Sequence, residues 1–306
     1  MKAPDAIPDT RPVTGRGSPD RARRARVRAE RYRLTENVGV FLVLALMALV
    51  MGSPLLWMIS TSLKPEIDVL RFPPQWIPDP AAWENYPRAL QQMRFAHFLR
   101  NSLIITVGGM AGVLFSSAVV GYGFARLHFP GKTFLFIVVV STMMLPPQVT
   151  IIPQFILFRE LGWINTFLPI IVPAFLGQSA FSIFLMRQFY LSLPREYEDA
   201  ARVDGANTFR VFWHIMLPLA WPGLLTIAIF SFMFYWNDFL QPLIYLTSTQ
   251  NWPLSLGLTL FRDRFAVPQW SLIMAASLMT LAPCLLLFFF TQRFLIRGVV
   301  IGGVQR

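Results

Sequence analysis

Apolar and charged positions are strongly segregated along the chain. Six stretches, each 25 to 28 residues long, contain no Asp, Glu, Lys or Arg. A helix needs about 20 predominantly apolar residues to cross the hydrocarbon core of a membrane. The pattern predicts an all-α membrane protein with six transmembrane helices, at about residues 38–60, 101–125, 133–158, 165–186, 222–246 and 271–292.

Two of the predicted spans contain residues that alter helix packing. Gly108, Gly112 and Ser116 recur every four residues in the second span, so they share one face and permit close approach of a neighbouring helix. The third span contains adjacent prolines, Pro146 and Pro147, which interrupt helical hydrogen bonding. Such a break is tolerated in a membrane where protein or a water-lined path satisfies the backbone. A packed kink and a substrate pathway both account for it.

The composition excludes most soluble classes. The chain is 55% hydrophobic and 14% charged, whereas soluble proteins carry about 25% charged residues. The single cysteine, Cys284, lies in the last apolar stretch, so neither a disulfide framework nor a cysteine metal cluster is expected. The three histidines, His97, His128 and His214, lie in separate segments without metal-ligand spacing. We therefore expect no catalytic, cofactor-binding or metal site.

Basic residues are concentrated before the first apolar stretch. Ten of the 27 Lys and Arg residues fall within residues 1–33, and a basic flank of this kind indicates the cytoplasmic side of a membrane rather than nucleic-acid binding. With both termini cytoplasmic, 19 basic residues lie inside and eight outside. We predict cytoplasmic termini, a disordered basic tail over residues 1–35 and a membrane domain over residues 36–306.

Residues 187–221 form the only long internal segment on the predicted cytoplasmic side. Three acidic residues favour the positive N-terminal end of a first helix. Gly205 suits the left-handed position at which that helix ends. Asn207 or Thr208 is suited to cap a second helix.

The first helix of this segment has a shallow face. Tyr197, Ala200, Ala201 and Asp204 are spaced i, i+3, i+4 and i+7, so they share one side of the helix. Another protein could dock on such a face. A plain amphipathic helix at the membrane surface is an equally good interpretation of the spacing.

The same residues resemble a known motif. The order and spacing of Asp199-Ala200-Ala201, Gly205, Ile215 and Leu217-Pro218 are similar to the EAA motif of binding-protein-dependent ABC importer permeases. The one departure is Asp199, where the family usually has Glu. The stretches GYGFARLHFPGK (121–132) and WNDFLQPLI (236–244) resemble the carbohydrate, or maltose-type, branch. The resemblance extends from about residue 38 to the C-terminus.

The resemblance implies a mechanism and partners. The helix around Glu198–Gly205 would be a coupling helix seated in a separate ATP-hydrolysing subunit, so this chain is expected to be non-catalytic, with Mg-ATP bound by the partner. The other implied partners are a second related permease, forming a heterodimer, and an extracytoplasmic sugar-binding protein. The location would be a bacterial or archaeal cytoplasmic membrane. The residues implied to couple to the ATPase are Glu198, Asp199, Ala200, Ala201, Asp204, Gly205, Ile215, Leu217 and Pro218.

A short phosphate-loop-like sequence does not change this interpretation. Gly131-Lys132-Thr133 matches the end of that pattern, but the pattern needs a glycine where Arg126 stands. We therefore expect no nucleotide site on this chain.

Asp238, with Asn237 and Trp236, is the remaining candidate site. A carboxylate, an amide and an indole could contact sugar hydroxyls or gate a pathway; alternatively, Asp238 satisfies the backbone of a broken helix. A different functional class, an ion-coupled secondary transporter, would use Asp238 as the coupling group. Within the importer class, glycerol phosphate or another polyol is the alternative cargo to a sugar.

Overall fold

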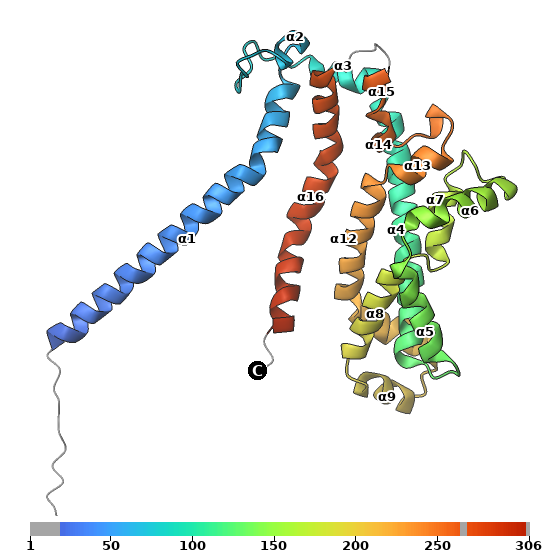
Figure 1. The fold of residues 1–306 in the computed structure, drawn as a ribbon. Helices are drawn as coiled ribbons and strands as arrows, with labels where there is room; N and C mark the ends of the chain where they lie inside the picture. Colours follow the sequence, from blue (N-terminus) through green and yellow to red (C-terminus); the bar gives the residue numbers. More distant parts are fainter. Residues whose placement is uncertain (1–18, 264–267, 304–306) are drawn as a thin grey trace, which may run out of the picture. The chain divides into compact units, whose positions relative to one another are not determined.

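The computed structural model of the chain describes residues 19–263 and 268–303. All regular elements in these ranges are helices, which confirms the all-α part of the predicted fold class. They are α1 (Pro19–Ser62), α2 (Glu66–Val69), α3 (Asn85–Gln92), α4 (Phe95–Arg126), α5 (Lys132–Ser141), η1 (Thr142–Met144), α6 (Pro147–Glu160), α7 (Leu168–Phe175), α8 (Ala180–Ser192), α9 (Glu196–Val203), α10 (Thr208–Val211), η2 (Phe212–Met216), α11 (Leu217–Leu219), α12 (Trp221–Asn237), α13 (Leu240–Tyr245), η3 (Thr249–Asn251), α14 (Leu254–Gly257), α15 (Leu260–Asp263) and α16 (Trp270–Gly303) (Figure 1). The chain divides between Trp57 and Met58 into two units.

The first unit consists of the N-terminal part of α1. This helix begins at Pro19, so it runs through residues 19–35, where the sequence predicted a disordered tail. The segment is rich in Arg and Ala, which have high helix propensities and so favour continuing the helix ahead of the apolar stretch. The remainder of the predicted tail, residues 1–18, lies outside the described residues.

Four of the described helices are long and apolar enough to cross a membrane, and there are up to six spans if each of two bent helix pairs is counted as one. The four are Val38–Ser62, Phe95–Arg126, Leu168–Ser192 and Trp270–Gln292; the bent pairs are Lys132–Met144 with Pro147–Glu160 and Thr208–Leu219 with Trp221–Asn237. The six predicted spans correspond in order to these six segments.

The predicted third span is sharply broken. Its two halves meet at 102°, and the break falls at Leu145 and Pro146, which both have extended backbone conformations. A proline disfavours the helical conformation of the residue before it, so two consecutive prolines stop the first half and start the second.

The predicted fifth span differs from the structure at its C-terminal end. We expected it to run to residue 246, but α12 ends at Asn237 and Asp238 has an extended backbone. The Asp238 side chain accepts a hydrogen bond from the Gln241 backbone N–H (3.3 Å) at the start of the short α13. A carboxylate in this position competes with continued helical hydrogen bonding, so the apolar residues beyond it form a separate element.

The helix α4 packs along α7, α8 and α12 in the second unit. The predicted small-residue face of α4 lies against α7: a Cβ on Gly112 would come within 2.9 Å of the Phe175 backbone nitrogen. One turn further on, Ser116 donates a hydrogen bond to the Ala174 carbonyl (2.8 Å). The small residues therefore serve close helix packing, as the spacing predicted.

Candidate functional site

The segment that carries the motif lies beside the C-terminal ends of α4 and α8 (Figure 1). Its first helix, α9, has acidic residues in the first turn and ends before Gly205, which has a φ of +80°. The backbone N–H groups of Gly205 and Ala206 donate back to the carbonyls of Arg202 and Ala201 (3.0 and 2.9 Å), as in a helix end closed by a left-handed residue. The predicted helix end is confirmed.

The second helix begins where the sequence placed it. The Asn207 side chain accepts a hydrogen bond from the Arg210 backbone N–H (2.9 Å) and caps α10. The chain then passes through the five-residue π-helix η2 and the short α11, and it bends by 71° before α12. Ile215 and Leu217 pack partly against the core, while Pro218 is exposed at this bend.

Two residues of α9 face the interior of the molecule. Glu198 and Ala201 are 5% and 7% exposed, and their i, i+3 spacing places them on the same side of the helix. The spacing placed Ala201 on one side of the helix with Tyr197, Ala200 and Asp204. In the structure Ala201 packs against the core, where its small side chain lets α9 approach closely.

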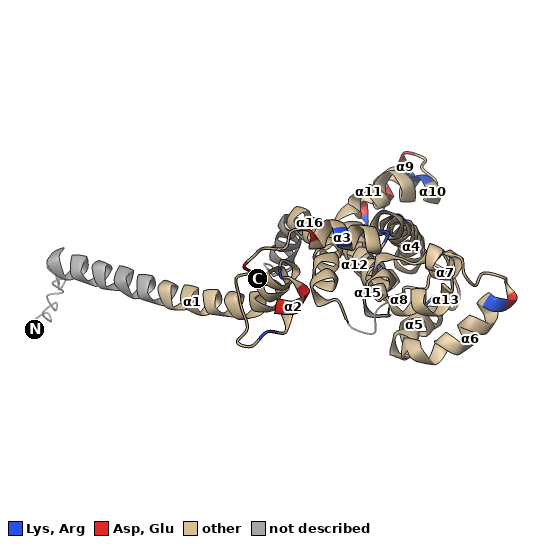
Figure 2. Ribbon diagram, turned by 90° about the horizontal axis from the view of Figure 1, so that it is seen from above, with Lys and Arg blue, Asp and Glu red and all other residues tan. Residues whose placement is uncertain are grey.

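The outward side of the segment combines carboxylates with apolar surface. Asp199, Ala200 and Asp204 are exposed. Val203 is 88% exposed and Phe209 is 70% exposed, although both are large apolar side chains. In Figure 2, α9 and α10 carry blue and red charged positions, whereas most of the ribbon is tan and uncharged. An exposed apolar patch flanked by charge is typical of a surface that binds another protein.

Glu198 forms a buried ion pair with Arg126, the last residue of α4. Arg126 Nε lies 2.9 Å from Glu198 Oε1, and the two side chains are 4% and 6% exposed. The Arg126 Nη2 group also donates to the backbone carbonyls of Tyr190 (2.7 Å) and Leu193 (2.5 Å) at the end of α8. One guanidinium group therefore joins α4, the end of α8 and α9.

Three aromatic rings pack against one another near the C-terminal ends of α4 and α8. The ring of Tyr122 lies 5.6 Å from that of Tyr190 and 5.0 Å from that of Phe212, measured between centroids. These three rings come from α4, α8 and η2. A second arginine, Arg202, lies 3.8 Å from Glu198 Oε2, but its side chain is 52% exposed. Glu198 thus has one buried and one solvent-facing cationic neighbour.

The sequence did not mark Arg126 as a functional residue; it served only as one of the basic residues counted for orientation and as the position that breaks the phosphate-loop pattern. Two signals could have identified it: it is the first charged residue after a charge-free stretch, and it belongs to the GYGFARLHFPGK sequence. The neighbouring phosphate-loop-like sequence is a turn: Gly131 has a φ of +74° before α5, and Lys132 Nζ donates to the Leu127 carbonyl (2.8 Å).

The side chains of the Asp238 group point to different surroundings. Trp236 is buried, stacks on Phe232 (5.4 Å between centroids) and donates its indole N–H to the Thr280 carbonyl on α16 (3.1 Å). Asn237 is exposed and donates to its own helix at the Met233 carbonyl (2.8 Å). Asp238 accepts from the start of α13, as described above. The structure does not bring the three together around one cavity.

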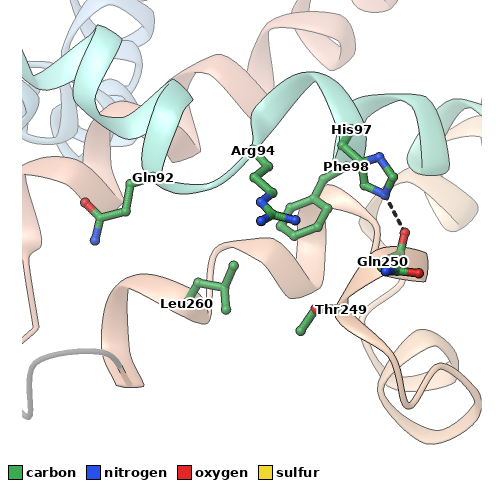
Figure 3. Close-up of a pocket in the computed structure, with 7 residues that line it drawn as sticks. All are labelled: Gln92, Arg94, His97, Phe98, Thr249, Gln250 and Leu260. Carbon is green, nitrogen blue, oxygen red and sulfur yellow. Dashed lines mark hydrogen bonds between the residues drawn. The ribbon is translucent and has the colours of Figure 1, made fainter.

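A polar cavity lies at the N-terminal end of α4, the end opposite the Arg126 ion pair. It has a volume of about 410 Å³. Its lining residues are Gln92, Arg94, His97, Phe98, Thr249, Gln250 and Leu260 (Figure 3). A His97 ring nitrogen lies 2.5 Å from the Gln250 carbonyl oxygen, which closes one side of the cavity. Amide, guanidinium and aromatic groups around one space are suited to a polar organic ligand.

No cluster of three or more His, Cys, Asp or Glu side chains placed to hold a metal ion occurs among the described residues.

The chain is similar to known transport proteins. The profile of a family described as "Binding-protein-dependent transport system inner membrane component" matches residues 108–301. The probable ABC transporter permease protein YurM of Bacillus subtilis is 34% identical over 273 residues, 88% of each chain. The arabinooligosaccharides transport system permease protein AraQ of Halalkalibacterium halodurans is 34% identical, covering 85% of this chain and 94% of AraQ.

Two further comparisons agree with these. The diacetylchitobiose uptake system permease protein NgcG of Streptomyces coelicolor is 31% identical, covering 86% of this chain and 87% of NgcG. Among solved structures, a chain of a bacterial ABC transporter involved in the import of the acidic polysaccharide alginate superposes with a TM-score of 0.75. It is 24% identical and the match covers 85% of this chain and 96% of that one, which establishes a shared fold.

Proposed function

The chain belongs to the family of binding-protein-dependent transport system inner membrane components, and from this premise we propose that it is the sugar-translocating permease subunit of an ATP-driven importer. It spans the cytoplasmic membrane several times. Cargo released by an extracytoplasmic binding protein would cross by alternating access, powered by a separate ATPase dimer that binds Mg-ATP. A second, related permease would complete the pathway.

The observation that carries this proposal is the geometry of α9. Its inward side is anchored by a buried ion pair, while its motif residues Asp199, Ala200 and Asp204 face outward. Val203 on α9 and Phe209 on α10 are unusually exposed apolar side chains in the same segment. A short helix that is anchored on one side and offers apolar and acidic groups on the other is suited to seat in a partner's groove.

The proposed orientation places α9 in the cytoplasm. The predicted topology, with 19 basic residues inside and eight outside, supports this choice. The cavity of Figure 3, at the other end of the 32-residue α4, would then face the binding protein. Sugar is the proposed cargo class because relatives that match most of the chain are named for arabinooligosaccharide and diacetylchitobiose transport.

The geometry of Asp238 fits the importer better than an ion-coupled transporter. Its carboxylate accepts from the Gln241 backbone N–H and its own carbonyl accepts from the Ser255 hydroxyl (2.7 Å). These bonds hold the chain where α12 gives way to α13. A role at a helix end therefore explains an acidic residue at this position without coupling to an ion.

Affinity purification from native membranes in mild detergent tests the proposal. We expect a phosphate-loop ATPase and a second multi-span permease to co-purify with the chain. The associated binding protein, and the sugar identified on it by mass spectrometry, would then provide a transport assay. Recovery of the chain alone, or only as a homo-oligomer, would contradict the proposal.

Gly205→Asp tests the motif itself. The substitution adds a side chain on the outward side of the segment, where a Cβ would meet nothing within 4 Å in the isolated chain. We expect ATP-driven uptake to fall at least tenfold. Gly162→Asp is the matched control, because Gly162 also has a positive φ (+69°) and open space around it but lies after α6. Equal uptake by both variants would contradict docking at α9.

A further inference from the structure

We propose that Arg126 is a positioning residue that makes α9 move as one body with α4 and α8. We call Arg126, Glu198 and the carbonyls of Tyr190 and Leu193 the Arg126 clamp. The inference rests on the proposed function, in which an ATPase displaces α9, and it goes beyond that function by naming the side chain through which the displacement reaches the transmembrane helices.

The clamp uses the shape of the guanidinium group. Arg126 Nε faces the Glu198 carboxylate at 2.9 Å, while Nη2 donates to the carbonyls of Tyr190 and Leu193 at 2.7 and 2.5 Å. A planar guanidinium group can present its charge to the carboxylate through one nitrogen while another nitrogen donates to the two carbonyls, whereas an ammonium group is a single point of charge. The two carbonyls end α8, so the same side chain orients α8 and α9 against α4.

The covalent connection between α8 and α9 does not provide this rigidity. Only Leu193, Pro194 and Arg195 separate the two helices, and Leu193 is extended (φ −75°, ψ 139°). A short extended link allows α9 to rotate about it unless side chains prevent the rotation. The other connection of α9 passes through Gly205, whose φ of +80° lies outside the helical region.

Burial makes the clamp hard to open. Both charged side chains are less than a tenth exposed. Separating the charges would leave each in an apolar environment without water, which is strongly unfavourable. A pulling or pushing force on α9 is therefore transmitted to α4 and α8 rather than absorbed at the contact.

The experiment measures the distance between α9 and α4 in the purified complex. Nitroxide labels are attached at Glu196→Cys on α9 and Leu103→Cys on α4, both exposed, after replacing the single native cysteine by Cys284→Ser. Pulsed electron–electron double resonance then gives the distance distribution without nucleotide and with ATP and vanadate. With the clamp intact, we expect one narrow distribution that is the same in both states.

Arg126→Gln and Arg202→Gln form a matched pair of variants. Both replace an arginine beside Glu198 by the same amide, but Arg126 is buried and Arg202 is half exposed. We expect the distribution to widen at least twofold and to shift with ATP and vanadate in Arg126→Gln, and to stay narrow in Arg202→Gln. The width of the distribution in Arg126→Lys should lie between those of the two glutamine variants, because lysine retains the positive charge but lacks the several fixed donors of the guanidinium group.

Several outcomes would overturn the clamp. If intact complexes carrying Arg126→Gln keep the narrow distance distribution of the unsubstituted protein, the ion pair stabilises the fold but does not couple the movement of α9 to that of α4 and α8. If Arg126→Gln does not accumulate, Glu198→Gln replaces it, and a narrow distribution there has the same meaning. The absence of a co-purifying ATPase from the unsubstituted protein would instead defeat the proposed function, whereas the nucleotide-free comparison of the variants would still test the clamp.

Discussion

The two ends of α4 are held in place by different kinds of interaction. At the C-terminal end, one buried guanidinium group of Arg126 joins three helices through an ion pair and two carbonyls. At the N-terminal end, several neutral groups hold the helix together. Asn101 donates to the carbonyls of Gln250 and Trp252 (2.8 and 3.0 Å), and Ser102 accepts from the Leu254 N–H (2.8 Å).

The elements around the N-terminal end of α4 are also held by several separate hydrogen bonds from different residues. The buried Asn85 on α3 donates to the carbonyls of Ser62 and Lys64 (3.0 and 2.9 Å). Glu66 accepts from the N–H groups of Trp270 and Ser271 (2.8 and 2.9 Å) and so caps α16. Removing one of several separate contacts leaves the others in place, whereas removing Arg126 affects every contact of its cluster. The α9 end is therefore expected to be far more sensitive to a single substitution.

The largest expected effect is that of Arg126→Ala. It leaves Glu198 buried and without its close cationic partner, which costs about 3–5 kcal/mol in comparable buried pairs. Thermal unfolding of the purified complex, followed by intrinsic fluorescence, measures the loss. Arg159→Ala is the control, because Arg159 pairs with Glu160 at 3.1 Å but both side chains are more than 60% exposed. Equal destabilisation by the two variants would remove the contrast between buried and exposed pairs.

Asn85→Ala tests the other end and should cost less. Two carbonyls lose a donor, and a lost hydrogen-bond partner at a buried site costs about 1–3 kcal/mol. The same unfolding measurement applies, with Asn237→Ala as the control because Asn237 is exposed and its amide donates to a carbonyl of its own helix. If Asn85→Ala lost more thermal stability than Arg126→Ala, the N-terminal end of α4 would be the more sensitive end, which contradicts the comparison.

Gly205→Ala separates backbone strain from steric conflict at the α9 end. No atom lies within 4 Å of a Cβ placed there, so only the positive φ opposes the substitution. The left-handed conformation costs a non-glycine residue about 1–2 kcal/mol. Gly123→Ala, also without close neighbours but inside α4, should be neutral or slightly stabilising in the same assay. If both variants lose the same stability, the strain assigned to Gly205 is absent.

Arg202→Gln should have the smallest effect. Its guanidinium group lies 3.8 Å from Glu198 and its side chain is half exposed, and such pairs contribute about 0.2–1 kcal/mol. Unfolding temperatures measured at low and high salt should differ little between this variant and the unsubstituted protein. A loss approaching that of Arg126→Ala would mean that the charge of Glu198 is shared equally between the two arginines.

The sequence by itself determined the class of the protein and the local form of its motif. Charge-free stretches of sufficient length predict membrane spans because hydrocarbon excludes unpaired charge. Gly205 and Asn207 predict a helix end and a helix cap because those conformations depend on the residue and its immediate neighbours. The coupling role of α9 and its partners follow from motif resemblance and stay predictions.

The tertiary structure decided which side of α9 faces inward and what holds it there. Arg126 and Glu198 are 72 positions apart in the sequence, and nothing in local periodicity connects two charges at such a separation. The end of α12 at Asn237 was likewise missed. Apolar residues continue past Asp238, but the Asp238 side chain accepts a hydrogen bond from the backbone of α13 and the helix ends there. Apolar stretches report which residues avoid water; the pairing of buried polar groups depends on which helices pack together.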